Sequence, residues 1–188
     1  MRYLAFDCET GGLDPKEHSL LTLYLAVYDE SFAMLDELDL KIKPEADGFY
    51  CVTAGAMGVN KINLVSHDRD AQPTSEATKR LFLFIKKWSD DSKNKLCPVA
   101  HNLPFDEAFI TNHLLKKSVW DSFISYHKLD TVGIAQFLKV KGKLPNRTPL
   151  RLGDLAKALS ISFNHNDLHG SKVDTLLCVE VLKAMLSY

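Results

Sequence analysis

The sequence has no apolar run long enough to cross a membrane. Its start also lacks the basic residues and long apolar stretch of a signal peptide, because acidic residues begin at position 7. These two absences predict a protein of the cytoplasm, or of a similar compartment, that works without a membrane.

Cysteine is scarce and scattered. The four cysteines, Cys8, Cys51, Cys97 and Cys178, include no Cys-x-x-Cys pair. Structural zinc sites and redox motifs usually need that spacing. We therefore expect four reduced thiols, most of them buried.

Internal repeats, low-complexity tracts and long linkers are missing as well. The chain has 188 residues, of which 46% are hydrophobic and 25% charged, as in an ordinary globular protein. This length suits one domain with a sizeable core. We expect a single domain over residues 1–188.

An overall positive charge is also lacking, since the formal net charge is −1. The distribution is uneven, because residues 1–50 carry eleven acidic and four basic side chains. The segment 139–151, KVKGKLPNRTPLR, has five basic residues and no acidic one. It is either a solvated loop or a contact for backbone phosphates, and the sequence leaves both open. The candidate phosphate contacts are Lys139, Lys141, Lys143 and Arg147.

What the sequence does contain is a regular succession of strand and helix patterns. Alternating or continuous apolar runs predict strands at 2–9, 19–29, 37–44, 97–102 and 127–131. Amphipathic patterns predict helices at 53–61, 74–91, 103–117, 131–140, 150–161 and 171–187. Three strands followed by helices and short strands predict a mixed α/β sheet with helices on its faces.

The first strand ends in FDCETGGL, which places two acidic residues two positions apart. Because alternate side chains share a face, Asp7 and Glu9 lie together while Cys8 points into the core. Two carboxylates at that spacing repel and raise each other's pKa, and a bound cation would relieve the repulsion. Taken alone, the pair could also flank a solvated turn.

Two further acidic residues lie on the apolar side of predicted helices. Asp106 shares a helix face with Phe109 and Ile110, and Asp174 heads the buried stripe of the last helix. A buried carboxylate is unfavourable unless it is paired, hydrogen-bonded or bound to a metal. Four acids therefore have a reason to converge. Oxygen ligands favour Mg²⁺ or Mn²⁺, and a pair of such ions suits phosphodiester cleavage.

A proton acceptor is predicted at His169, five residues before Asp174 on the loop that enters the last helix. A neutral imidazole is suited to removing a proton from an attacking water. An exposed side chain without a role is the alternative for a single loop histidine. The short spacing to Asp174 favours the catalytic interpretation.

Three motifs, FDCET, HNLPFD and HGSKVD, together resemble those of the DEDDh (DnaQ-like) 3′–5′ exonucleases and occur in the same order. LDT (129–131) and LGDLAKALSI (152–161) also resemble family segments. The resemblance implies a ribonuclease-H-like α/β fold, with a five-stranded mixed sheet whose first three strands are antiparallel. It implies two divalent cations, Mg²⁺ or Mn²⁺, and His169 as the general base. The implied ligands are Asp7, Glu9, Asp106 and Asp174, with Asp7 bridging the two ions.

The resemblance also implies the residues around the 3′-terminal nucleotide. These are Thr10, Gly11, Leu13, Met57, Asn60, Asn102 and Phe105. Two positions depart from the family's pattern. Lys61 stands where members often have glycine, which leaves the shape of the nucleotide pocket open, and Ser171 stands where they often have alanine.

The implied activity is removal of nucleoside 5′-monophosphates from the 3′ end of single-stranded DNA or RNA. One alternative is a catalytically silent exonuclease fold that binds nucleic acid or protein. Another is a proofreading subunit that docks on a polymerase or on another replication or repair partner. A third is an enzyme of this fold that cleaves short oligonucleotides or dinucleotides. The choice between DNA and RNA depends on contacts to the 2′-hydroxyl.

Overall fold

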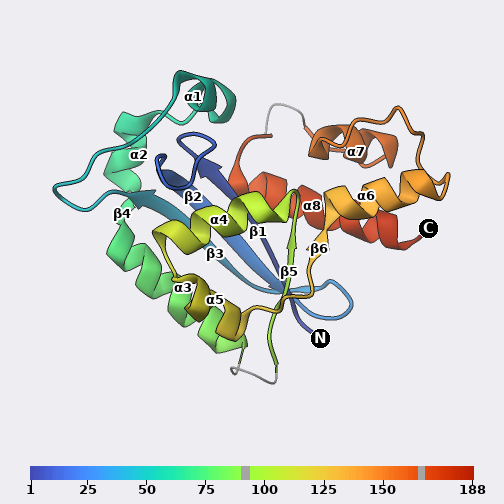
Figure 1. The fold of residues 1–188 in the computed structure, drawn as a ribbon, viewed down its shortest axis with the longest axis horizontal. Coiled ribbons are helices and arrows are strands. Elements are labelled where there is room, and N and C mark those ends of the chain that lie inside the picture. Colours follow the sequence, from blue (N-terminus) through green and yellow to red (C-terminus); the bar gives the residue numbers. More distant parts are fainter. Residues whose placement is uncertain (90–93, 165–167) are drawn as a thin grey trace.

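The computed structural model describes residues 1–89, 94–164 and 168–188 (Figure 1). One six-stranded sheet has the order β4-β3-β2-β1-β5-β6. The strands are β1 (Tyr3–Thr10), β2 (Leu20–Tyr28), β3 (Met34–Lys43), β4 (Gln72–Pro73), β5 (Cys97–Ala100) and β6 (Leu129–Asp130). The helices are α1 (Ala54–Asn60), α2 (Leu64–Asp70), α3 (Thr74–Trp88), α4 (Leu103–His113), α5 (Lys117–Phe123), α6 (Thr131–Val140), α7 (Leu152–Ala158) and α8 (Ser171–Leu186).

The sheet is mixed, as predicted. β1 pairs antiparallel with β2 and β2 antiparallel with β3, whereas β5 runs parallel to β1 and β6 parallel to β5. The expected number of strands is wrong by one, because Gln72 and Pro73 pair in parallel with Ile42 and Lys43 as a sixth strand. A two-residue strand is too short to show an alternating pattern, so the sequence gives no sign of it.

Helices form at each of the six predicted places, mostly with later starts or earlier ends. Part of the predicted helix 74–91 falls on residues 90–93, outside the described residues. Two further helices, α2 and α5, were not predicted. Each has seven residues, about two turns, which is too short for a clear amphipathic period.

Helices cover both faces of the sheet (Figure 1). One face packs on α3, α4 and α5, and its core includes Leu4, Phe6 and Cys8 of β1. The other face packs on α8, with Ala5 of β1 in its core. Helices α6 and α7 pack in turn on α8. Because side chains alternate along a strand, Asp7 shares the α8 face with Ala5.

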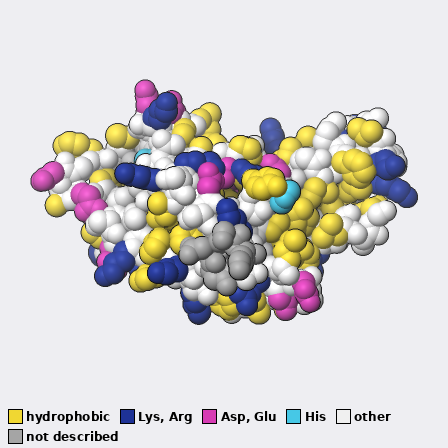
Figure 2. Space-filling model, turned by 60° about the horizontal axis from the view of Figure 1, so that its bottom comes forward, with side chains coloured by type: hydrophobic (Ala, Val, Ile, Leu, Met, Phe, Trp, Pro, Cys, Tyr) yellow, Lys and Arg dark blue, Asp and Glu magenta, His cyan; other side chains and the backbone are white. Residues whose placement is uncertain are grey.

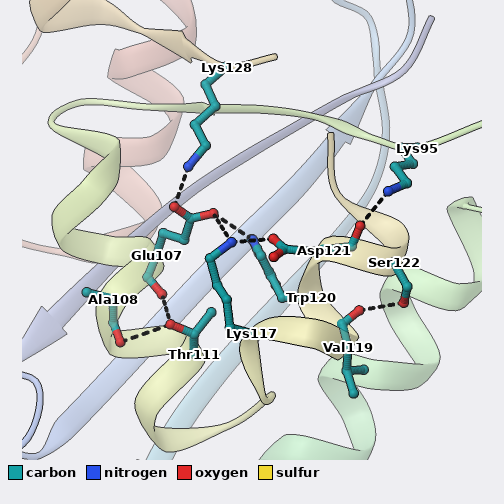
Figure 3. A network of polar contacts seen from close by, with 10 residues as sticks. All are labelled: Lys95, Glu107, Ala108, Thr111, Lys117, Val119, Trp120, Asp121, Ser122 and Lys128. Carbon is teal, nitrogen blue, oxygen red and sulfur yellow. Dashed lines mark hydrogen bonds and ion pairs between the residues drawn. The ribbon is translucent and has the colours of Figure 1, made fainter. Parts of the chain in front are cut away.

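A polar network ties α4 to α5 (Figure 3). Its centre is Glu107, which is 8% exposed and accepts a hydrogen bond from Trp120 Nε1 at 3.1 Å. Lys128 donates to the other carboxylate oxygen, and Lys117 Nζ lies 3.7 Å from the first. Glu107 directly follows Asp106 on α4, so these contacts fix the helix that presents Asp106.

Three of the four cysteines, Cys8, Cys97 and Cys178, are buried, and Cys51 is exposed. All four are free, as expected. None of the described helices has both the length and the apolar character needed to cross a bilayer.

Candidate active site

Three of the predicted acids converge where β1 ends beneath the first turn of α8. One carboxylate oxygen from each of Asp7, Glu9 and Asp174 lies within 4.8 Å of the other two. The first two come from alternate positions of β1, and the third comes from the helix that packs across that strand. The strand period and the packing of α8 therefore bring Asp174 together with two acids that lie at least 165 residues earlier in the sequence.

The fourth acid, Asp106, approaches the same place from α4. Its side chain is buried, with 3% exposed, and its Oδ1 accepts a hydrogen bond from the backbone N–H of Cys8 at 3.0 Å. Cys8 lies between Asp7 and Glu9 in β1. Asp106 thus sits next to the group of three, within range to repel Asp7 electrostatically.

The pKa of each of these carboxyl groups is raised. Burial, followed by the charges of Asp106, Asp174 and Glu9, raises the pKa of Asp7 well above its usual value. Burial and neighbouring acids raise the pKa of Glu9 to about 8. Burial raises the pKa of Asp106 to about 7, against the opposing hydrogen bonds from Cys8. Burial also raises the pKa of Asp174. Four such groups are unfavourable as anions unless a cation accompanies them.

One oxygen of Asp174 supports a cation more directly. Its Oδ2 accepts a hydrogen bond from the backbone N–H of His169 at 3.1 Å. Its Oδ1 is buried and has no hydrogen-bond partner within the described part of the chain. A buried oxygen without a donor usually has an unseen water or ion as its partner. Together with Asp7 and Glu9, this oxygen makes an all-carboxylate donor set that fits Mg²⁺ or Mn²⁺.

His169 lies at the opening of the site. It is exposed, its backbone is left-handed with φ 71°, and it lines a cleft of about 420 Å³ together with Asp7 and Asp174. The predicted proton acceptor and two of the predicted metal ligands therefore face the same space. The three residues 165–167 that lead toward it lie outside the described residues.

The same cleft contains residues that the sequence analysis did not single out. Its wall includes His101, Arg151 and Asp154. The Nδ1 of His101 lies 2.8 Å from Thr131 Oγ1, and burial lowers the pKa of this imidazole. The sequence did offer a signal for two of them, because His101 is the first residue of the HNLPFD motif and Arg151 is the last residue of the basic segment 139–151.

A second cleft, of about 490 Å³, lies on the Glu9 side of the acids. Four of the predicted nucleotide contacts line it, namely Thr10, Leu13, Asn60 and Phe105. The Nδ2 of Asn60 donates to the backbone oxygen of Thr10 at 3.1 Å, which attaches α1 to the end of β1. The structure thus brings four of the seven predicted nucleotide contacts together, from β1, the turn after it, α1 and α4.

The other predicted contacts lie elsewhere. Gly11 is packed so closely that a Cβ would lie 2.3 Å from the backbone oxygen of Cys51, so it shapes the turn after β1. Within the described residues, neither Met57 nor Asn102 lines either cleft. Asn102 is exposed, and its backbone N–H donates to Asp130 Oδ1 at 3.0 Å.

The basic segment forms the connection between α6 and α7. Lys139 lies in the last turn of α6, whereas Lys141, Lys143 and Arg147 are exposed. None of the four lines either cleft among the described residues, so a contact with substrate phosphates stays a prediction. On the face shown in Figure 2, lysine and arginine side chains are scattered among acidic and hydrophobic ones.

Comparison with known proteins decides the class. The family model described as exonuclease, RNase_T, matches residues 4–182. The chain belongs to the exonuclease family. This confirms the resemblance to the DnaQ-like 3′–5′ exonucleases of the ribonuclease-H-like superfamily. A search of curated proteins gave no match.

Solved structures of exonuclease I share the fold of this exonuclease family member. E. coli exonuclease I in complex with a dT13 oligonucleotide superposes with a TM-score of 0.75 and 19% identity over 98% of this chain and 40% of that one. The zinc-bound E. coli ExoI–ssDNA complex superposes with a TM-score of 0.77 and 20% identity, over 99% of this chain and 40% of that one. A further exonuclease I structure, concerned with processivity, superposes with a TM-score of 0.78 and 17% identity, over 99% of this chain and 41% of that one. The chain spans about two-fifths of the length of these proteins.

Proposed function

We propose that this chain is a metal-dependent 3′–5′ exonuclease that releases nucleoside 5′-monophosphates from the 3′ end of single-stranded DNA or RNA. The observation that carries the proposal is the convergence of Asp7, Glu9 and Asp174, with an unpartnered buried oxygen on Asp174. Membership of the exonuclease family supports the reaction class. The E. coli exonuclease I complexes with single-stranded DNA support the substrate class.

The acids would hold the cofactor. Asp7, Glu9 and Asp174 would bind Mg²⁺ or Mn²⁺, with Asp106 completing a site for two ions. When bound, such ions polarise an attacking water and offset the charge that develops on the phosphate. The zinc-bound form of E. coli exonuclease I supports a divalent cation in this fold.

The remaining residues would bind the strand and move the proton. The 490 Å³ cleft would receive the 3′-terminal nucleoside, with Leu13 and Phe105 offering apolar surface to the base. His169 would accept a proton from the attacking water, because it faces the same cleft as Asp7 and Asp174. The water oxygen would bond to the terminal phosphorus as the bond to the 3′ oxygen of the preceding nucleotide breaks, and that oxygen would take up a proton from solvent to become a hydroxyl group.

The partner and the organisation of the chain belong to the same proposal. We infer that residues 1–188 work as one exonuclease domain in a cytoplasmic setting. A solved ExoI/SSB-Ct complex makes a single-strand-binding protein the replication or repair partner to test first, ahead of a polymerase. A silent module that only binds nucleic acid is disfavoured, because the four acids and His169 all gather at one place.

Single substitutions test the catalytic roles. Asp7→Asn should abolish Mg²⁺-dependent release of mononucleotides from a 3′-labelled strand. His169→Ala should lower kcat about 100-fold or more with little change in KM, the usual contribution of a general base. His127→Ala is the matched control, because His127 is also exposed and lies outside both clefts. Full activity in Asp7→Asn would contradict the proposal.

A further inference from the structure

The first turn of α8, which presents Asp174, has one side-chain hydrogen bond of its own, from Thr175 Oγ1 to the backbone oxygen of Ser171 at 2.7 Å. Gly170 stands at the N-cap, where the described residues provide no side-chain cap. The Asp174 carboxylate itself accepts a hydrogen bond from the backbone N–H of His169. The same carboxylate faces Asp7 and Glu9, whose charges repel it. Contacts from outside the helix therefore add to what keeps this turn in place.

One such contact is a pair of hydroxyl groups. Thr22 Oγ1 donates to Ser171 Oγ at 3.0 Å, and Ser171 is buried, with 6% exposed. Thr22 lies directly opposite Glu9 in the antiparallel pairing of β1 with β2, so the two side chains share a face of the sheet. Ser171 stands where the resembled family often has alanine, which has no hydroxyl. Its hydroxyl attaches the first residue of α8 to the strand beside the acids.

A second contact joins the next residue of α8 to β2 and β3. Both carboxylate oxygens of Glu37 accept from Lys172 Nζ, at 3.0 and 3.1 Å, and one also accepts from the hydroxyl of Tyr24. The ammonium group of Lys172 lies 5.2 Å from the centre of the Tyr24 ring. Tyr24 is fully buried and lies opposite Asp7 in the sheet. Lys172 is thus attached to the strand neighbour of one acid, two residues before Asp174.

We propose that Ser171 and Glu37 are positioning residues that hold the carboxylate of Asp174 at cation-binding distance from Asp7 and Glu9. Consecutive residues of a helix point in directions about 100° apart. Anchoring both Ser171 and Lys172 therefore restricts rotation of the first turn as well as its lift from the sheet. Neither Ser171 nor Glu37 would bind the cation directly. Each would influence cation binding by fixing the position of α8 and so of Asp174. The inference rests on the proposed function for the identity of its ligand, a divalent cation.

The test is a Mn²⁺ titration of the full chain, with free Mn²⁺ measured by electron paramagnetic resonance. Ser171→Ala and Glu37→Ala should each raise the Mn²⁺ dissociation constant about 3- to 10-fold, at or below the range for residues that orient a metal ligand. Glu37→Gln keeps an acceptor for Tyr24 and Lys172 and should lie closer to wild type. Lys183→Ala is the matched control, because it breaks an exposed ion pair of 2.9 Å with Glu180 at the far end of α8. Its Mn²⁺ affinity should be unchanged.

Thermal unfolding in EDTA separates positioning from stability. If Ser171→Ala and Glu37→Ala lose thermal stability but keep the wild-type Mn²⁺ affinity, the contacts are only structural and the inference is overturned. Equal weakening by Lys183→Ala would also overturn it, because the effect would not be local to the first turn. Failure of the wild-type chain to bind Mn²⁺ would instead refute the proposed function, and the inference with it.

Discussion

The backbone N–H of Cys8 donates a hydrogen bond of 3.0 Å to the carboxylate of Asp106. Cys8 is the residue between Asp7 and Glu9, so α4 docks on β1 at the amide that separates the two acids. This bond gives the buried Asp106 a partner and explains how it lies beside the three converging acids. At the start of α4, the backbone N–H groups of Asn102 and Leu103 donate to Asp130. The position of Asp106 therefore depends on two attachments of α4, one to Asp130 at its start and one to Cys8 of β1.

The Glu107 network should contribute strongly to stability. Glu107→Ala should lower the free energy of unfolding by about 2 kcal/mol, because it leaves the buried indole N–H of Trp120 without its acceptor, whereas Lys128, whose side chain is 33% exposed, can turn to water. Urea unfolding followed by circular dichroism measures this. Lys117→Ala is the control, since its side chain is 54% exposed and should cost about 1 kcal/mol or less. Similar losses for both variants would contradict the importance given to the buried contacts.

Lys61→Gly should stabilise the protein. Lys61 ends α1 in the left-handed conformation, with φ 57° and ψ 21°, and its N–H donates to the backbone oxygen of Met57. A side chain is strained there and glycine is not, so a gain of about 1 kcal/mol in the free energy of unfolding is expected. Lys61→Ala retains the Cβ and should give no such gain. A lower stability for Lys61→Gly would show that the lysine side chain itself supports α1.

Leu13 should serve the substrate and not the fold. Its side chain is 84% exposed on the wall of the 490 Å³ cleft. Leu13→Ala should leave the melting temperature unchanged and raise KM for a single strand about 5-fold, the effect of losing about 1 kcal/mol of apolar contact. Val65→Ala, which removes a 76% exposed side chain from α2, should alter neither quantity. An unchanged KM in Leu13→Ala would place the terminal base elsewhere.

The metal-free protein should lose stability as the pH rises. The pKa of Glu9 is raised from 4.5 to about 8 and that of Asp106 from 3.8 to about 7, so the folded chain holds more protons than the unfolded chain in that window. The free energy of unfolding therefore falls between about pH 4 and pH 8 in EDTA. Melting temperatures across this range, with EDTA and with Mg²⁺, measure the effect. Mg²⁺ should flatten the curve, and Glu9→Gln should reduce the slope without metal. A rising curve in EDTA would contradict the electrostatics of the site.

Local periodicity predicted the parts of the site that depend on one element. Strand alternation placed Cys8 in the core and the two acids on one face, and helix spacing placed Asp106 on a buried side. The same reasoning gave no sign of β4, whose two residues pair only because the chain returns beside β3. Met57 was named from the family resemblance and lines neither cleft among the described residues, so its contact with the substrate stays a prediction.

Two residues of the 420 Å³ cleft were not predicted from the sequence for a similar reason. Arg151 and His101 lie 50 positions apart, at the start of α7 and just after β5. They meet because α7 packs on α8, and α8 packs on β1. No local pattern encodes that arrangement. The residue patterns and the family resemblance pointed to the acids and His169 but not to the side chains that complete the wall around them.

Cleavage of nucleotides one at a time from a free 3′ end is the activity on which the other proposals depend. The most direct measurement is to incubate the wild-type chain with a 5′-labelled single strand and Mg²⁺ or Mn²⁺, and to identify the released products by mass spectrometry. We expect a ladder of shortened strands, nucleoside 5′-monophosphates as products, and loss of both in EDTA or with a blocked 3′ end. Internal cleavage, release from the 5′ end, or equal activity in EDTA would contradict it.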